Sequence, residues 1–210
     1  VWDIANNYEK IHYINNSYKG NILSALLLFN VNKKNYIIIS SNNTNDYTKI
    51  YNFDDGKYIQ DMIDTNMNKT NHLLTWKKND DFYVVELCNQ KICIYDFVDN
   101  KNYATLTCEP ESDYYDGYVF LQKYLCCSTY KGYIRIWDLI QKSIYKIIEI
   151  TGAKLRGILN WNNDKLIVAN YSNNSLDIIS IENEKIIKQI KTPHSPSVKG
   201  IKKIYNNNYG

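Results

Sequence analysis

The sequence predicts an all-β fold built from a four-stranded unit that repeats along the chain. Two observations carry this expectation. Apolar and polar residues alternate over short segments, which is the period of a β-strand, and one short phrase that ends such a segment recurs at a nearly constant spacing. The stretch 124–150 shows both features most clearly, so the rest of the chain is compared with it.

The stretch 124–150 reads as three strands joined by two turns. Leu125 and Cys127 point to one face of its first strand, because successive side chains alternate. Gly132 closes the first turn, since glycine accepts the positive φ that tight turns require. The residues of 144–150 are largely β-branched or aromatic and predict a third strand.

The middle strand ends on an apolar, aromatic, Asp-like, apolar phrase that recurs along the chain. The central positions of its copies are residues 2, 51, 95, 137 and 179, and a strand-like segment precedes each copy from the second onward. One such unit cannot bury both faces of its own sheet, so neighbouring units have to stack. The copies are Val1–Ile4, Ile50–Phe53, Ile94–Phe97, Ile136–Leu139 and a worn form, Ile178–Ile181.

The phrase YIRIWD at 133–138, following a hairpin, resembles the WD-repeat family of β-propellers, whose blades repeat every roughly 40–45 residues. The resemblance implies four-stranded blades, with four complete blades and partial blades at both ends of a single segment, 1–210. It also implies a larger closed ring, so that the segment alone would leave sheet edges open and would not behave as a stable monomer. The implied boundaries are a partial blade at 1–19, blades at about 20–64, 71–108, 117–150 and 154–191, and the start of a further blade at 197–210.

Taken in order, each complete blade is expected to contain four strands. The first runs through Ile22–Phe29, Tyr36–Ser41, Thr48–Phe53 and Tyr58–Ile63; the second through His72–Trp76, Phe82–Leu87, Lys91–Phe97 and Tyr103–Cys108. The third begins with Tyr118–Leu121 and continues through 124–150. The fourth runs through Leu155–Trp161, Lys165–Asn170, Leu176–Ile181 and Ile186–Lys191.

The sequence departs from the family pattern in one respect that bears on cohesion. WD repeats typically combine a Gly-His dipeptide, an Asp in the turn after the second strand, a Ser or Thr, and Trp in a hydrogen-bonded tetrad. No Gly-His dipeptide occurs here, and the turn after the second strand of the third blade reads Tyr130-Lys131. We therefore expect no intact tetrad, and cohesion through packing of β-branched and aromatic side chains.

Composition narrows the class of protein. The net charge is +3, and Arg135 and Arg156 are the only arginines among 25 basic residues, which makes nucleic acid an unfavoured partner. The five cysteines are odd in number and form no Cys-x-x-Cys pair, which predicts buried, reduced thiols in a cytoplasmic protein. No apolar run reaches the length of a transmembrane segment.

No pattern of catalytic or ligand-binding residues emerges. His12, His72 and His194 fall in different blades and outside metal-ligand spacing, and they are expected at turns or on the surface. There is no phosphate-binding glycine-rich loop and no nucleophile motif. The sequence thus predicts a protein that is not an enzyme, with no catalytic residues, no cofactor and no metal.

One segment stands out as a candidate partner-binding surface. Four acids and two tyrosines crowd the expected loop before the third blade. In the WD-repeat family this loop and the turn between the second and third strands emerge on the same face, so Tyr130 should point outward beside the loop tyrosines. A solvated connector is the alternative interpretation. The candidate residues are Glu109, Glu111, Asp113, Tyr114, Tyr115, Asp116 and Tyr130.

Two functions are compatible with these features. The favoured one is a non-catalytic scaffold for protein–protein assembly, with other proteins, the subunits of a larger complex, as partners, because a rigid propeller presents many loops on one face. The alternative is a module that contacts nucleic acid or anionic phospholipid through a lysine-rich end. The lysines of that end are Lys185, Lys188, Lys191, Lys199, Lys202 and Lys203.

Overall fold

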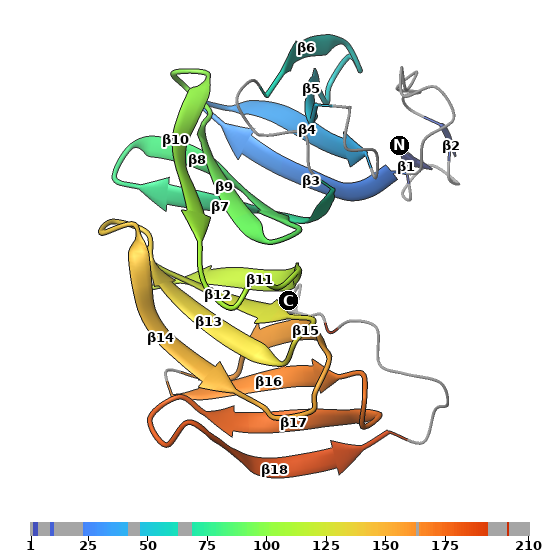
Figure 1. Ribbon diagram of the computed structural model, residues 1–210. Coiled ribbons are helices and arrows are strands. Elements are labelled where there is room, and N and C mark those ends of the chain that lie inside the picture. The colour runs from blue at the N-terminus through green and yellow to red at the C-terminus, as the bar shows by residue number, and fades with distance from the viewer. Residues whose placement is uncertain are drawn as a thin grey trace, which may run out of the picture. The chain divides into compact units, whose positions relative to one another are not determined.

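A computed structural model of the chain describes residues 2–3, 9–10, 23–41, 47–62, 69–162, 164–192 and 201. Within these ranges every regular element is a β-strand (Figure 1). The strands form four four-stranded antiparallel sheets and one short pair. The all-β repeat fold is therefore confirmed for the described residues. None of these residues lies in a helix long and apolar enough to cross a membrane.

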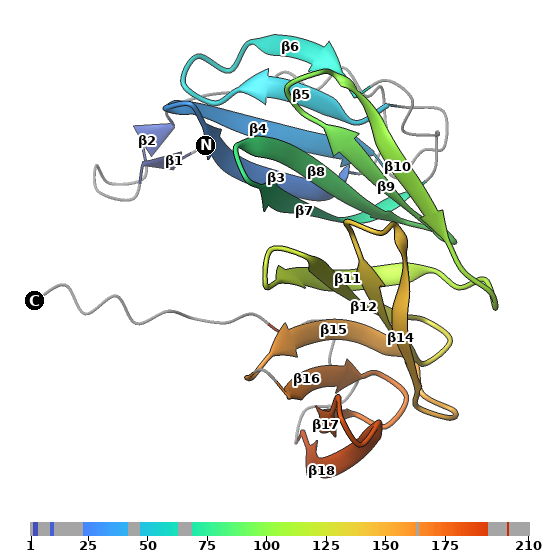
Figure 2. The ribbon, with the colours of Figure 1, turned by 90° about the vertical axis from the view of Figure 1, so that its left-hand side faces the viewer.

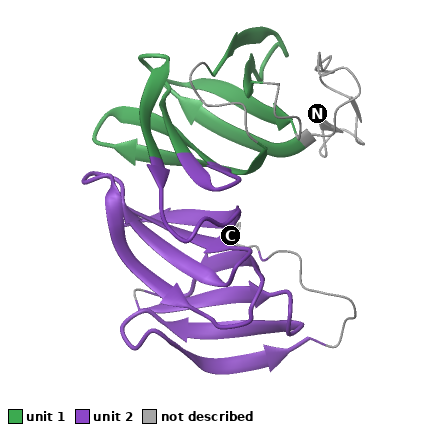
Figure 3. Ribbon diagram, in the orientation of Figure 1, with its two compact units in different colours: residues 1–86, 93–105 green, residues 87–92, 106–210 purple. Residues whose placement is uncertain are grey.

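The chain divides into two compact units (Figure 3). Unit 1 comprises residues 1–86 and 93–105, and unit 2 comprises residues 87–92 and 106–210. The short pair of strands near the N-terminus, β1 (Trp2–Asp3) and β2 (Glu9–Lys10), is antiparallel. The partial blade expected at 1–19 lies outside the described residues apart from these two strands. The further blade expected at 197–210 lies outside the described residues, apart from residue 201.

The first two sheets follow the order of the chain, with neighbouring strands hydrogen-bonded (Figure 1). Buried apolar side chains of unit 1 pack between them, and the rings of Phe29 and Phe82 stack at 5.0 Å between centroids. The buried core residues are Ile38, Ile50, Met62, Leu73, Val84 and Tyr95. The strands are β3 (Leu23–Val31), β4 (Lys34–Ser41), β5 (Lys49–Asn52), β6 (Tyr58–Asp61), β7 (Thr70–Lys78), β8 (Asp81–Cys88), β9 (Lys91–Asp96) and β10 (Lys101–Thr107).

The third and fourth sheets belong to unit 2 and repeat the same order, as Figure 2 shows for β15 to β18. One continuous apolar core joins them; it includes Cys126, Ile136, Ile158, Val168 and Ile179, and each of these is at most 1 % exposed. The strands are β11 (Tyr114–Phe120), β12 (Tyr124–Thr129), β13 (Tyr133–Asp138), β14 (Ser143–Glu149), β15 (Leu155–Asn160), β16 (Lys165–Asn170), β17 (Ser175–Ser180) and β18 (Lys185–Lys191).

The recurring Asp-like position of the sequence phrase has the same role in all four sheets. A side-chain oxygen there accepts hydrogen bonds from backbone N–H groups two or three residues further on, at 2.8–3.1 Å. This arrangement closes the turn from the third strand to the fourth, as short polar side chains commonly do. The four residues are Asn52, Asp96, Asp138 and Ser180.

The aromatic position beside it lies at a β-bulge. The register of the third and fourth strands shifts between Ile136 and Trp137, and shifts at the corresponding places occur in the first and fourth sheets. Trp137 is 2 % exposed, and its buried Nε1 has no hydrogen-bond partner. The intact tetrad of WD repeats is thus missing here, as the sequence predicts, and packing holds the side chain.

The start of the third blade differs from the prediction. The sequence placed its first strand at Tyr118–Leu121, whereas β11 begins at Tyr114. A register shift between Tyr114 and Asp116 leaves Tyr115 bulged out of the ladder. Bulges bend a strand and redirect a side chain, so a segment rich in acids and tyrosines can still be a strand.

Candidate partner-binding site

The loop 109–113 is hydrogen-bonded to the turn that follows β12. The Tyr130 N–H donates to the Asp113 carbonyl oxygen at 3.0 Å, and the Lys131 N–H donates to Ser112 Oγ at 3.1 Å. This pairing confirms that the loop and the turn are neighbours. Glu109 and Glu111 are exposed on the loop, where the Glu109 carboxylate accepts a hydrogen bond from the Glu111 N–H at 3.2 Å.

Tyr114 does not point outward, contrary to the prediction. Its side chain is 0 % exposed, and its hydroxyl accepts a hydrogen bond from Arg135 Nη1 at 2.7 Å. Burial raises the pKa of Tyr114 well above its usual value, although Arg135 opposes the rise. The residue is a strand residue of β11 whose phenol is enclosed, and it cannot contact a partner directly.

The Asp116 carboxylate accepts two backbone hydrogen bonds and so has a structural role. One carboxylate oxygen accepts a hydrogen bond from the Gly117 N–H at 2.9 Å, and the other accepts one from the Ile158 N–H at 3.1 Å. The second bond links β11 to β15, the first strand of the next sheet. The carboxylate therefore joins two blades of unit 2, and it is not part of an acidic ring around the tyrosines.

Tyr115 and Tyr130 do lie together, and cations accompany them. Their ring centroids are 5.6 Å apart. Lys154 Nζ lies 4.8 Å from the centroid of Tyr130, and Arg156 Cζ lies 5.2 Å from that of Tyr115 and 4.5 Å from that of Tyr171. These five residues, Tyr115, Tyr130, Lys154, Arg156 and Tyr171, are called the tyrosine–cation cluster.

The cluster forms because the blade β15–β18 repeats the backbone geometry of the blade β11–β14. The Tyr171 N–H donates to the Lys154 carbonyl oxygen at 2.8 Å, just as Tyr130 bonds to Asp113 in the preceding blade. Arg156 occupies a bulge between Leu155 and Gly157 that matches the bulge at Tyr115. The two bulges bring a guanidinium group over a phenol ring, a favourable cation–π arrangement.

The electrostatics of the cluster favour retained positive charge. Burial raises the pKa of Tyr115, Arg156 lowers it, and the charge of Asp113 raises it again, with a net rise. A hydrogen bond to the Tyr130 hydroxyl raises the pKa of Lys154. The Tyr115 phenol therefore stays protonated and the Lys154 amine stays positively charged at neutral pH.

Lys154, Arg156 and Tyr171 are not among the residues that the sequence predicts for this site. One signal was present, because Tyr171 follows the second strand of its blade as Tyr130 does, one repeat earlier. The contact of Arg156 with both rings depends on two bulges in different sheets, and no local pattern of residues encodes it.

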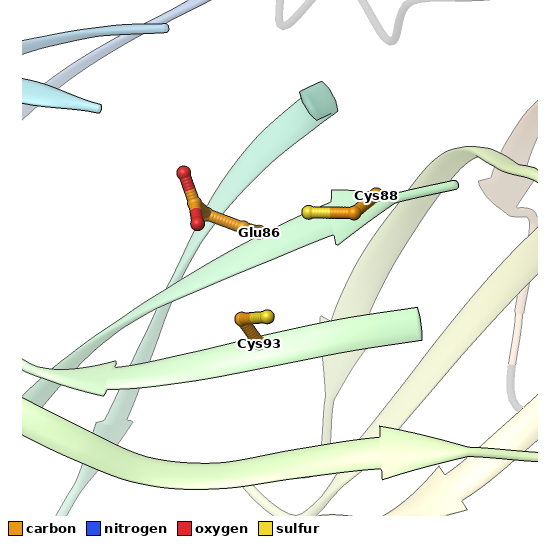
Figure 4. A group of neighbouring side chains, drawn as sticks. All are labelled: Glu86, Cys88 and Cys93. Atoms are coloured by element: carbon orange, nitrogen blue, oxygen red, sulfur yellow. The ribbon is translucent and has the colours of Figure 1, made fainter. Parts of the chain in front are cut away.

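A second group of polar side chains lies on neighbouring strands β8 and β9 (Figure 4). One carboxylate oxygen of Glu86 and the sulfur atoms of Cys88 and Cys93 lie within 4.8 Å of one another, and all three residues are buried. The Glu86 carboxylate accepts hydrogen bonds from the Thr48 and Thr70 hydroxyls. Structural zinc sites use four ligands, and the described residues supply three here. The group is therefore assigned no function.

No protein-family model matches the chain, and no curated protein matches it either. Among solved structures the chain is similar to "Dihydro-heme d1 dehydrogenase NirN in complex with DHE", a β-propeller protein, with a TM-score of 0.65. The chain has a β-propeller fold. The matching region covers 86% of this chain and 39% of the NirN chain, at 12% identity. The propeller thus spans less than half the length of NirN, and identity this low indicates a shared fold alone.

Proposed function

We propose that this propeller is of the WD-repeat type and serves as a non-catalytic scaffold for protein–protein assembly within a larger complex. Its contact face is the tyrosine–cation cluster together with the loop 109–113. One observation carries the proposal: three tyrosines and an arginine, all half-buried, are held in place by one another at the surface. Tyrosine and arginine are the residue types that most often dominate binding energy at interfaces.

The way these side chains are held supports the same function. Binding normally costs the entropy of ordering side chains, roughly 0.5–1.5 kcal/mol for each flexible one. Here ring–ring and cation–π contacts order Tyr115, Tyr130 and Arg156 before a partner arrives. The backbone beneath them is fixed as well, through the bond between Tyr130 N–H and Asp113 O. A partner would therefore meet a preorganised surface.

A comparison of two variants tests this proposal. Tyr115→Ala/Tyr130→Ala/Tyr171→Ala removes the rings of the cluster, and Tyr145→Ala removes an exposed tyrosine of β14 as a matched control. Each variant and the wild type would be used for affinity purification from native extract, followed by quantitative mass spectrometry. We expect a set of proteins that the wild type and the control recover and the cluster variant loses. Equal recovery by all three proteins, with native circular dichroism, would mean that the contact face is not the tyrosine–cation cluster.

A lysine-rich surface supports the second candidate function, binding to nucleic acid or anionic phospholipid. All seven residues of β18 are exposed, among them Lys185, Lys188 and Lys191. The other lysines of the predicted basic end, Lys199, Lys202 and Lys203, lie outside the described residues. Binding to single-stranded RNA or to phosphatidylserine vesicles that weakens steeply with salt, and that Lys185→Glu/Lys188→Glu abolishes, would favour this candidate.

A further inference from the structure

The two arginines of this chain have different surroundings, and the difference points to a ligand. Arg135 is fully buried and donates hydrogen bonds to the Tyr114 hydroxyl and the Pro110 carbonyl oxygen. Arg156 is half-buried and its guanidinium lies over the rings of Tyr115 and Tyr171, but among the described residues no oxygen accepts a hydrogen bond from it. The Nε of each arginine is shielded from solvent and has no partner in the part of the chain that the structure describes, but Arg135 uses both of its Nη atoms as donors and Arg156 uses neither.

A shielded guanidinium that has no acceptor at any of its nitrogen atoms costs free energy, so Arg156, unlike Arg135, is left in need of an acceptor. The described part of the chain places no carboxylate in ion-pair contact with Arg156. Lys154, with its raised pKa, adds a second cation to the cluster. The charge of Asp113 acts on the neighbouring Tyr115, whose pKa it raises. An arginine held rigidly by stacking, with its planar set of donors unused, fits an oxyanion that offers two oxygens in one plane.

We propose that Arg156 binds an oxyanion group, a carboxylate or a phosphoryl group, carried by a side chain of a partner protein. The rings of Tyr115 and Tyr171 hold the guanidinium through cation–π contacts, and Lys154, over the Tyr130 ring, adds a second positive charge to the cluster. This inference rests on the proposed scaffold function and names the chemistry that the scaffold recognises.

The surroundings favour a single oxyanion on a protein over a phosphodiester chain. Glu109 and Glu111 are exposed on the loop 109–113, which is bonded to the turn that carries Tyr130. Repeated phosphates of a nucleic acid would meet these carboxylates, whereas one acidic side chain can be placed beside Arg156 alone. Nucleic-acid binding accordingly counts as an outcome against the proposal.

Nuclear magnetic resonance can observe the two arginines directly, because two Nε–H signals are expected and Arg156→Lys assigns them. The ¹⁵N-labelled chain would be titrated separately with inorganic phosphate, acetate and, at matched ionic strength, sodium chloride. We expect a saturable shift of the Arg156 signal with phosphate or acetate and no shift of the Arg135 signal. Whichever anion binds more tightly identifies the phosphoryl or the carboxylate group.

The conservative variant supplies the control. Arg156→Lys keeps the charge but loses the fork of donors, so the affinity for the anion, followed through backbone amides near residue 156, should fall at least about tenfold. No saturable shift with either anion, or the same shift with sodium chloride, would overturn the proposal. Tighter, Arg156-dependent binding of a uridine oligonucleotide would overturn it as well.

The same variant separates this inference from the scaffold function. Affinity purification with Arg156→Lys should lose the partners that Tyr115→Ala/Tyr130→Ala/Tyr171→Ala loses. If Arg156→Lys keeps them while the tyrosine variant does not, the scaffold function stands and oxyanion recognition is wrong. If neither variant loses partners while phosphate or acetate still binds, both the scaffold face and the recognition of a partner's side chain are wrong, and the site binds a small anion instead.

Discussion

At the scale of single residues, Gly132 illustrates how tightly the turn between β12 and β13 is built. Its φ is 84°, and a Cβ there would lie 2.6 Å from the Ile150 carbonyl oxygen and 2.9 Å from that of Ala153. Gly152 has a φ of 73°, but a Cβ would meet nothing within 4 Å.

We expect Gly132→Ala to lower the free energy of unfolding more than Gly152→Ala does. The second variant carries only the cost of a left-handed backbone, roughly 1–2 kcal/mol. The first adds a steric clash of roughly 1–3 kcal/mol. Urea unfolding of both variants measures the difference. Equal losses would mean that the chain around Gly132 relaxes to accept a methyl group.

Asp138 provides a prediction that depends on pH. Burial by itself would raise the pKa of Asp138, but hydrogen bonds from the Gln141 N–H, the Lys123 ammonium and the Ile140 N–H lower it, and the net pKa lies below its usual value. Because the folded-state pKa is depressed, the stability that Asp138 contributes is complete above the unfolded pKa, roughly 4, and disappears as pH falls through the folded pKa.

Asp138→Ala should therefore destabilise the protein by about 1–3 kcal/mol at pH 7, since two backbone donors lose their acceptor. The difference from wild type should shrink below about pH 4. Asp99→Ala, which removes an exposed acid that pairs with Lys101, serves as the control and should change stability little. Unfolding curves at several pH values provide the check, and a difference that does not vary with pH would contradict the role of the charge.

At the scale of elements, Asp116 couples β11 to β15. Replacing it with alanine leaves the Ile158 N–H without its acceptor, and Ile158 is 1 % exposed. We expect Asp116→Ala to cost about 1–3 kcal/mol of unfolding free energy. Asp113→Ala is the matched control, because Asp113 accepts the Tyr130 N–H through its backbone oxygen, which remains. Similar losses in both variants would show that the link between the blades is dispensable.

Local signals in the sequence predict most strands, but they do not predict the strand that contains Asp116. The strand at 165–170 was predicted to the residue, because alternation and short turns are local signals. The start of β11 was missed because an acid in a strand looks like a loop residue. Asp116 is tolerated in the strand because the N–H of Ile158, far along the chain, donates a hydrogen bond to its carboxylate. Non-local partners of this kind leave no trace in local patterns.

The candidate site divides in the same way. Family topology correctly placed Tyr130 beside the loop before the third blade, since that proximity follows from strand order. The burial of Tyr114 and the stacking of Arg156 between two rings were not predictable, because both depend on which residue a bulge displaces. One residue of register decides which side chain faces inward.

At the scale of the whole molecule, the cysteines report on the integrity of the fold. None of the five, all of which lie among the described residues, forms a disulfide bond; Cys88, Cys93, Cys126 and Cys127 are buried, and Cys108 is partly exposed. Burial raises the pKa of Cys126 to about 12, although the Tyr118 hydroxyl lowers it, and burial also raises that of Cys127. A thiol reacts through its thiolate, so these sulfurs are both shielded and protonated at pH 8.

Alkylation of the native protein with iodoacetamide at pH 8 should therefore modify Cys108 alone, and all five cysteines should react in urea. Intact mass spectrometry counts the adducts, and Cys108→Ser should reduce native labelling to none. Rapid native labelling of Cys126 or Cys127 would mean that the core of unit 2 opens readily.

The turn that closes the third strand of each blade has a consequence for how such a protein can vary. Asn52, Asp96, Asp138 and Ser180 are three residue types in one place, and each supplies one oxygen to the N–H groups ahead of it. The turn requires a side-chain oxygen at that point, and Asn, Asp or Ser can each supply it. Different residues at this position therefore give the same turn, and the sequences of the repeats can diverge while their geometry remains the same.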